Sequence, residues 1–120
     1  MDLKNIASDF LQLVIAGKID EAYEKYVDMK GKHHNIYFPS GFSTLKDAMK
    51  ENHEQFPDKV FEIKNIIAEN NLVTTHSHLY LGEKQIAVVH VFRFEKDKII
   101  EMWDVGQEIP KEHPNKDGAF

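Results

Sequence analysis

The stretch QIAVVHVFRFEKDKIIEMWDVGQ, residues Gln85–Gln107, decides the fold. Two runs rich in β-branched and aromatic residues, Ile86–Phe94 and Ile99–Gln107, flank the polar segment EKDK, which is typical of a β-hairpin. Each run carries one polar side chain among apolar neighbours, His90 in the first and Asp104 in the second. Buried polar side chains need partners. We therefore expect these two to meet on one face of the sheet, at the bottom of a ligand cavity.

The register of this hairpin decides whether the two side chains meet, because neighbouring residues of a strand point to opposite faces of a sheet. A loop made of Lys96-Asp97 alone places His90 opposite Trp103. One more loop residue, or a bulge, gives the pairs His90–Asp104, Phe92–Met102 and Arg93–Glu101, and puts Phe92, Phe94, Ile100 and Met102 on the face of His90. We favour this second register because its last pair joins opposite charges on the outer face.

Three helices are expected before the strands. Apolar residues at helical spacing predict amphipathic helices over Leu3–Ala16 and Ile19–Val27. A third helix is expected to begin with a cap at Ser43 or Thr44. It should end at Phe56-Pro57, because proline cannot continue a helix.

An alternation of period two follows these helices. Val60–Glu69 and Leu72–Leu81 predict two strands that lead into the hairpin, giving four successive antiparallel strands. Earlier in the chain, Lys30–Phe42 reads as a short strand or extended arm, and residues 109–120 read as an extended C-terminal arm. This order predicts one α+β domain over residues 1–120: three N-terminal helices packed in a strongly curved antiparallel sheet, forming a cone with an internal pocket.

Composition excludes several classes of function. The chain has 120 residues, a net charge of −5 and a single arginine, so it lacks the basic surface of a nucleic-acid binder. No apolar run approaches the roughly 20 residues that cross a bilayer, and the N-terminus lacks the apolar core of a signal peptide. We expect a cytoplasmic protein without nucleic-acid or membrane partners. Apolar residues on the outer face of the hairpin favour a homodimer through that face.

The polar residues allow three readings. A histidine facing a carboxylate in an apolar cavity is a competent acid–base pair, because the carboxylate orients the imidazole and burial tunes its pKa. The same two residues, His90 and Asp104, could instead be a satisfied core pair. His76 and His78 share one face of a strand, and with His33-His34 and His90 they suggest a histidine metal site as a third reading.

Several motifs resemble one known family. The HHN segment at His33–Asn35, the strand VTTHSH and the C-terminal VFRFEKDKIIEMWDVGQ are similar to the SnoaL-like polyketide cyclases, within the nuclear-transport-factor-two-like superfamily of cone-shaped α+β domains. The resemblance implies cofactor-independent acid–base catalysis of an intramolecular aldol-type ring closure on a small, polyketide-like carbonyl compound. It also implies that Asp104 is the acid/base and that His90 assists it. Many relatives carry a histidine where this chain has Met102, and several carry an aspartate where it has His90.

The sequence thus favours a cyclase- or isomerase-type enzyme with a small-molecule substrate and neither organic cofactor nor metal. A non-catalytic ligand-binding module on the same fold is the alternative, and a histidine metal site is a further one. The expected catalytic residues are Asp104 and His90. The expected substrate-binding residues are His34, Asn35, Tyr37, Phe38, His76, His78, Phe92 and Met102.

Overall fold

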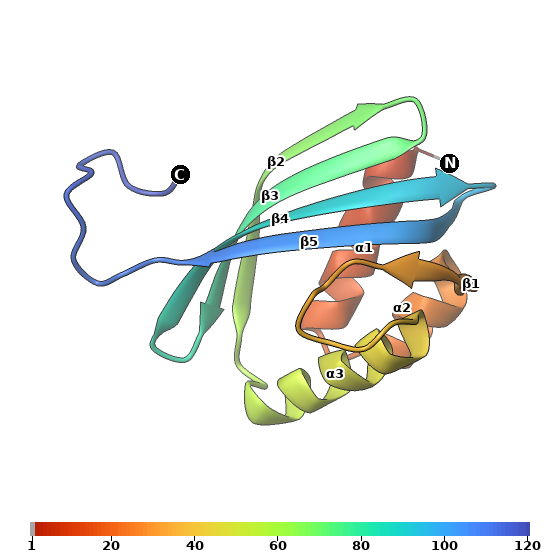
Figure 1. Ribbon diagram of the computed structural model, residues 1–120, viewed down its shortest axis with the longest axis horizontal. Helices are drawn as coiled ribbons and strands as arrows, with labels where there is room; N and C mark the ends of the chain where they lie inside the picture. The colour runs from red at the N-terminus through yellow and green to blue at the C-terminus, as the bar shows by residue number, and fades with distance from the viewer. Residues whose placement is uncertain (1) are drawn as a thin grey trace.

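The computed structural model describes residues 2–120 and contains three α-helices and five β-strands (Figure 1). Their order is α1 (Leu3–Ile15), α2 (Ile19–Tyr26), β1 (Val27–His33), α3 (Phe42–Gln55), β2 (Val60–Glu69), β3 (Leu72–Leu81), β4 (Lys84–Glu95) and β5 (Lys98–Glu108). None of the described helices is both long and apolar enough to cross a membrane.

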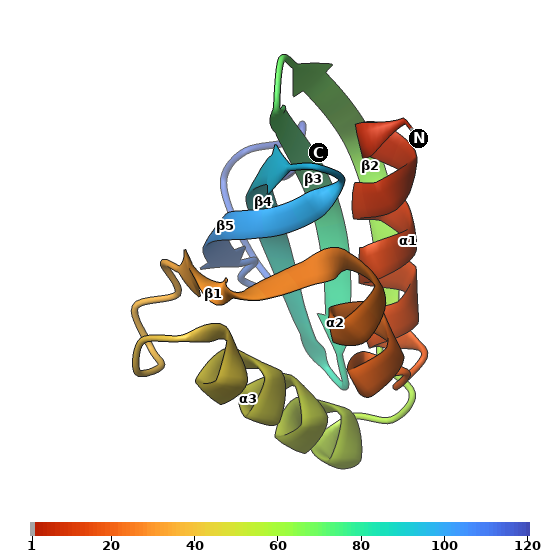
Figure 2. The same cartoon turned by 90° about the vertical axis from the view of Figure 1, so that its right-hand side faces the viewer.

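The five strands form one sheet in the order β1-β5-β4-β3-β2. Neighbours from β2 to β5 run antiparallel, as predicted, and the helices lie on one side of the curved sheet (Figure 2). The α+β cone is therefore confirmed. The sheet is mixed, however, because β1 pairs with β5 in parallel and forms a fifth, edge strand. A short strand or arm was expected within Lys30–Phe42. The strand instead begins three residues earlier, at Val27 directly after α2, and ends at His33.

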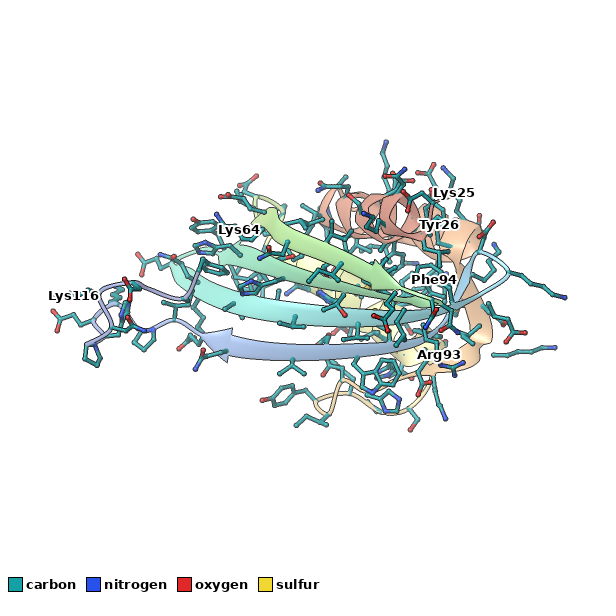
Figure 3. The ribbon with its side chains drawn as sticks, turned by 90° about the horizontal axis from the view of Figure 1, so that it is seen from above. Lys25, Tyr26, Lys64, Arg93, Phe94 and Lys116 are labelled. Carbon is teal, nitrogen blue, oxygen red and sulfur yellow. The ribbon has the colours of Figure 1, made fainter. Side chains whose placement is uncertain are left out.

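The hairpin adopts the favoured register, and a bulge produces it. The turn itself is only Lys96-Asp97, whose φ angles of 50° and 64° are typical of a tight hairpin turn. Between Arg93 and Phe94 the pairing shifts, giving Glu95–Lys98, Phe94–Ile99, Arg93–Glu101 and His90–Asp104. Arg93 and Phe94 lie next to each other near this turn in Figure 3. The extra residue is therefore Ile100, in the strand and not in the loop.

The bulge corrects one expected orientation. Ile99 is fully buried on the inner face, whereas Ile100 is half-buried and lies outside the core cluster. The expectation that Ile100 shares the face of His90 was wrong, because the bulged residue interrupts the alternation of side chains. Phe92, Phe94 and Met102 are buried as predicted.

The core fills the space between the helices and the inner face of the sheet. Phe10 of α1 meets Tyr23 of α2 edge-on at 5.5 Å between ring centroids, and Phe92 of β4 at 5.9 Å. Tyr23 in turn packs edge-on against Phe42 at the start of α3. Edge-to-face aromatic pairs of this kind add to the stabilisation from apolar burial. They fix the positions of α1, α2 and α3 against the sheet.

The start of α3 differs from the prediction. The helix begins at Phe42 after Gly41, and neither Ser43 nor Thr44 caps it. The Thr44 hydroxyl instead donates to the Ser40 carbonyl at 3.2 Å. The helix starts early because Phe42 is fully buried, and its apolar contacts position the first turn without a side-chain cap.

The C-terminal segment, residues 109–120, contains neither helix nor strand, as expected. It turns away from the end of β5 and back, with Lys116 at its outermost part in Figure 3. Phe120 returns to the sheet and stacks on His78 at 4.4 Å. The arm thus contacts the outer face of β3, opposite the helices.

Candidate functional site

A pocket of about 410 Å³ lies between the inner face of the sheet, α1, α3 and the segment that follows β1. Most of its wall is aliphatic or aromatic, and such apolar pockets with a few polar groups are typical of small-molecule sites. Its polar and charged lining residues include Asn35, Asn52, Lys59, His90 and Asp104.

His90 and Asp104 face each other across β4 and β5 and both line this pocket. His90 is only 8% exposed, and its Nδ1 has no hydrogen-bond partner within residues 2–120. Its ring stacks on Phe92 at 5.7 Å. Burial lowers the pKa of His90, and the negative charge of Asp104 opposes this shift. The imidazole is therefore held neutral near pH 7, and its buried Nδ1 has no partner within residues 2–120.

Asn35 fixes the Asp104 carboxylate. Its side-chain NH₂ donates to Asp104 Oδ2 at 2.9 Å, while its own Oδ1 accepts from the Tyr37 backbone N–H at 3.0 Å. The Asn35 backbone N–H donates to His33 Nδ1 at 3.1 Å. These bonds hold one carboxylate oxygen and leave the other one available to a ligand. The turn after β1 is therefore a positioning element for the site.

Tyr23 lies on the helical side of the same region. Burial raises the pKa of Tyr23 well above its ordinary value, and the negative charge of Asp104 adds to this effect. Its hydroxyl contacts the sulfur of Met49 in α3 at 3.2 Å. Tyr23 thus stays protonated throughout the physiological range and contributes a neutral hydroxyl behind the pocket wall.

The sequence model of the SnoaL-like domain matches residues 7–102. This chain belongs to the SnoaL-like family. The match begins within α1, includes α2, α3, β1 and the part of the sheet that carries His90, and ends two residues before Asp104.

Solved structures support the same fold. A SnoaL-like polyketide cyclase from Agrobacterium tumefaciens is 20% identical, with a TM-score of 0.75 over 89% of this chain and 92% of that chain. A cystatin-fold protein from Novosphingobium aromaticivorans is 19% identical, with a TM-score of 0.76 over 88% and 98%. An NTF2-like protein of unknown function from Burkholderia xenovorans is 19% identical, with a TM-score of 0.75 over 93% and 87%. At these identities the likeness establishes the fold alone. The comparison with curated proteins found no match.

Within this SnoaL-like domain, the expected pocket residues divide between the two faces of the sheet. Asn35, Tyr37, Phe38, His90 and Asp104 line the pocket. Phe92 and Met102 share their face but lie in the closed core, outside the pocket lining. Met102, which the resemblance in sequence marked as a departure from the family, is therefore a buried, apolar core residue.

His34 lies on the opposite, outer face. Its ring stacks on Trp103 at 4.9 Å, and its Nε2 lies 2.6 Å from Glu101 Oε2. Arg93 contacts the other oxygen of the same carboxylate through two nitrogens, at 2.9 and 2.7 Å. These contacts lower the pKa of Glu101; the hydrogen bond with His34 has the largest effect, and the bonds from Arg93 have the next largest. The expectation that His34 lines the pocket is corrected, because Asn35 and not His34 turns inward from the end of β1.

His76 and His78 also lie on the outer face. Both rings contact Phe120, and His78 Nε2 lies 2.9 Å from the side-chain oxygen of Gln85. They do share one face, as their spacing predicted, but the inner face of β3 belongs to the buried Thr75 and Ser77. Among residues 2–120, no three histidine or carboxylate side chains are arranged to hold a metal ion.

Three polar or charged residues of the pocket wall were not predicted from the sequence, and one of them is Glu108 at the end of β5. Asn52 comes from α3, and Lys59 from the residue directly before β2. The spacing of Lys59, Phe61 and Ile63 is the signal that could have found the lysine, because residues two apart in a strand share a face. A lysine at the start of a strand ordinarily reads as solvent-exposed.

Proposed function

We propose that this SnoaL-like domain is a cofactor-independent enzyme that uses acid–base chemistry on a small carbonyl compound. The reaction type is an intramolecular aldol cyclisation or a related isomerisation. One observation carries the proposal: a carboxylate oriented by Asn35 faces a buried, unpartnered histidine inside an apolar pocket. A titratable group whose pKa is shifted by burial in a pocket, here His90, is typical of a functional site.

In the proposed reaction, Asp104 is the base. Its carboxylate takes the proton from the carbon next to a substrate carbonyl, giving an enolate and a carboxylic acid. The enolate carbon then forms a bond to a second carbonyl carbon of the same molecule. The resulting alkoxide takes the proton back from Asp104. In an isomerisation, the proton returns to a different carbon instead, so protons balance in both cases without a co-reactant.

His90 stabilises the oxyanion in this scheme. Because burial lowers its pKa, the imidazole is neutral near pH 7 and one of its nitrogens carries a hydrogen to donate. A hydrogen bond to the enolate oxygen in a dry pocket is stronger than the same bond in water. Asn35 contributes indirectly, by keeping the Asp104 carboxylate in one orientation.

Turnover of a carbonyl library by Asp104→Asn tests the proposal. The library contains diketones able to cyclise and β,γ-unsaturated ketones, whose isomerisation to conjugated enones is followed by ultraviolet absorbance. We expect the substitution to lower kcat by roughly 10²–10⁴-fold, the usual contribution of a positioned base. Glu108→Gln is the matched control, because Glu108 also borders the pocket but is exposed and paired with Lys84 at 3.8 Å. Equal turnover by Asp104→Asn and the wild type would overturn the assignment.

A ligand-binding module without turnover is the second candidate. The observation that favours it is the largely apolar pocket wall, which suits retention of a hydrophobic ligand, together with the buried Met102 in place of a polar group. The same library distinguishes the two functions. A compound that binds tightly in a thermal-shift assay but is returned unchanged after prolonged incubation supports the module and contradicts the enzyme.

A further inference from the structure

Lys59 is a buried charged side chain that the proposed reaction does not use. The residue is 9% exposed, and its ammonium nitrogen has no hydrogen-bond partner within residues 2–120. An ammonium group without partners is costly to bury, so such a group needs a compensating role. Burial accordingly lowers the pKa of Lys59. No carboxylate of the described chain forms an ion pair with it.

The strand alternation directs Lys59 towards the pocket. It stands directly before β2, and Phe61, two residues further on, lines the pocket. Val60 and Glu62 have the opposite orientation and border a separate hollow outside, which Lys59 also touches. Since residues two apart in an extended chain share a face, the side chain of Lys59 lies on the side of Phe61.

Lys59 and the pair His90–Asp104 lie at different depths along the sheet. Phe61 pairs with Leu79, which pairs with Ile86, four residues before His90 in β4. At about 3.3 Å per residue, Ile86 and the paired Phe61 lie about 13 Å from His90 along the strand direction. The wall between them consists of apolar side chains, among them Leu79, Ile86 and Val88. Lys59 and the pair His90–Asp104 thus border the pocket at two separate levels, with apolar side chains between them and with the Lys59 ammonium buried in the wall.

The other charged residue near the Lys59 end is already paired. Glu108 borders the pocket, but its carboxylate lies 3.8 Å from Lys84 and its side chain is 63% exposed. Asn52 of α3, which also lines the pocket, is neutral. Among the described residues that line the pocket, Lys59 is therefore a cationic side chain without an acidic partner from the protein.

We propose that Lys59 binds an anionic group, such as a carboxylate, at one end of an elongated apolar ligand whose carbonyl lies at Asp104 and His90. The position of the carbonyl rests on the proposed function, whereas the anion site rests on Lys59 alone. The substrate class is accordingly a carbonyl compound with an acid group, separated from the reacting carbon by a hydrocarbon section. A buried ammonium–carboxylate pair is a strong, orienting contact.

Two fluorescent probes with the same aromatic body test the anion site. 8-Anilino-1-naphthalenesulfonate carries one anionic group, and N-phenyl-1-naphthylamine is its neutral counterpart. We expect Lys59→Met to weaken binding of the sulfonate at least tenfold and to leave the neutral probe within twofold, because a hydrogen bond to a charged group is lost and the apolar stem is kept. Lys64→Met is the matched control, because Lys64 lies on the outer face over Phe120 and should change neither affinity.

Two further measurements keep the outcomes distinct. Lys59→Met should unfold at a higher temperature than the wild type, because it replaces a buried, unpaired ammonium by an apolar group; unfolding at a lower temperature contradicts the claim that the ammonium is unpaired. Asp104→Asn should retain sulfonate binding even if it abolishes turnover. If turnover survives Asp104→Asn while Lys59→Met still loses the sulfonate, the proposed reaction fails and the anion site stands. Unchanged sulfonate binding by Lys59→Met, or equal weakening of both probes, overturns the anion site.

Discussion

Gly31 of β1 lies where the chain crosses the bulge of β5, and replacing it tests how the sheet holds the site together. A Cβ atom added there would lie 2.2 Å from the backbone oxygen of Ile100 and 2.9 Å from a ring carbon of Phe42. Real Cβ atoms essentially never come closer than 3.0 Å, so Gly31→Ala must push the two strands apart by about 0.8 Å. Rotating a side chain cannot relieve this contact, because the Ile100 oxygen belongs to the backbone.

The cost follows from the few bonds that attach β1. The parallel pairing consists of Val27–Ile99, Lys32–Glu101 and His33–Met102, and the His34 N–H donates to the Met102 carbonyl at 2.8 Å. Weakening about two backbone hydrogen bonds costs roughly 0.5–1.5 kcal/mol each, and overpacking adds about 1–3 kcal/mol. We expect Gly31→Ala to lower the free energy of unfolding by about 3 kcal/mol, and Tm by about 10 °C for a domain of this size.

Thermal and urea unfolding, followed by circular dichroism, measure this effect. Gly106→Ala in β5 is the matched control, because a Cβ there would come no closer than 3.4 Å to Ile86. The same separation should move Asn35 away from Asp104 and lower any turnover. If Gly31→Ala unfolds within about 2 °C of the wild type, the two strands can separate freely and the reasoning is refuted.

Two other predictions concern pH and assembly. Burial lowers the pKa of His90, so below about pH 6.5 the unfolded chain binds a proton at this residue that the folded protein does not bind. The free energy of unfolding should therefore fall as the pH drops below that value. His90→Gln should flatten this part of the profile in urea titrations, the exposed His113→Gln should not, and an unchanged slope in His90→Gln contradicts the burial argument. The second prediction is a homodimer through the outer sheet face, where Val105 is 68% exposed. Val105→Lys should convert the dimer to a monomer in size-exclusion chromatography with light scattering, Met29→Lys on the edge strand β1 should not, and a monomeric wild type would refute the dimer.

The pairing of His90 with Asp104 could be predicted because two independent patterns agree on it. The alternation of apolar residues in each arm and the opposite charges of Arg93 and Glu101 select the same register. The position of the extra residue could not be predicted. A longer loop and a bulge in the strand both give the pairs Arg93–Glu101 and His90–Asp104. Only the backbone conformation at Ile100 shows which of these two arrangements the chain adopts.

The faces of the remaining polar residues were harder to predict. His76 and His78 share a face, but which face is buried depends on Thr75 and Ser77, whose small polar side chains do not look like core residues. Parallel pairing of β1 with β5 joins segments about 70 residues apart, and local spacing carries no information about such a pair. Without it, neither the outward His34 nor the inward Asn35 could be assigned to a face.

The stacking of His34 on Trp103 makes the single tryptophan of this chain an optical reporter of the site. His34 directly precedes Asn35, and Trp103 directly precedes Asp104, so the outer stack and the inner hydrogen bond connect the same two backbone segments. Any movement that draws the end of β1 away from β5 must alter the surroundings of the indole ring. The emission of Trp103 therefore follows, in real time and without a label, whether the carboxylate in the pocket is held by its amide partner.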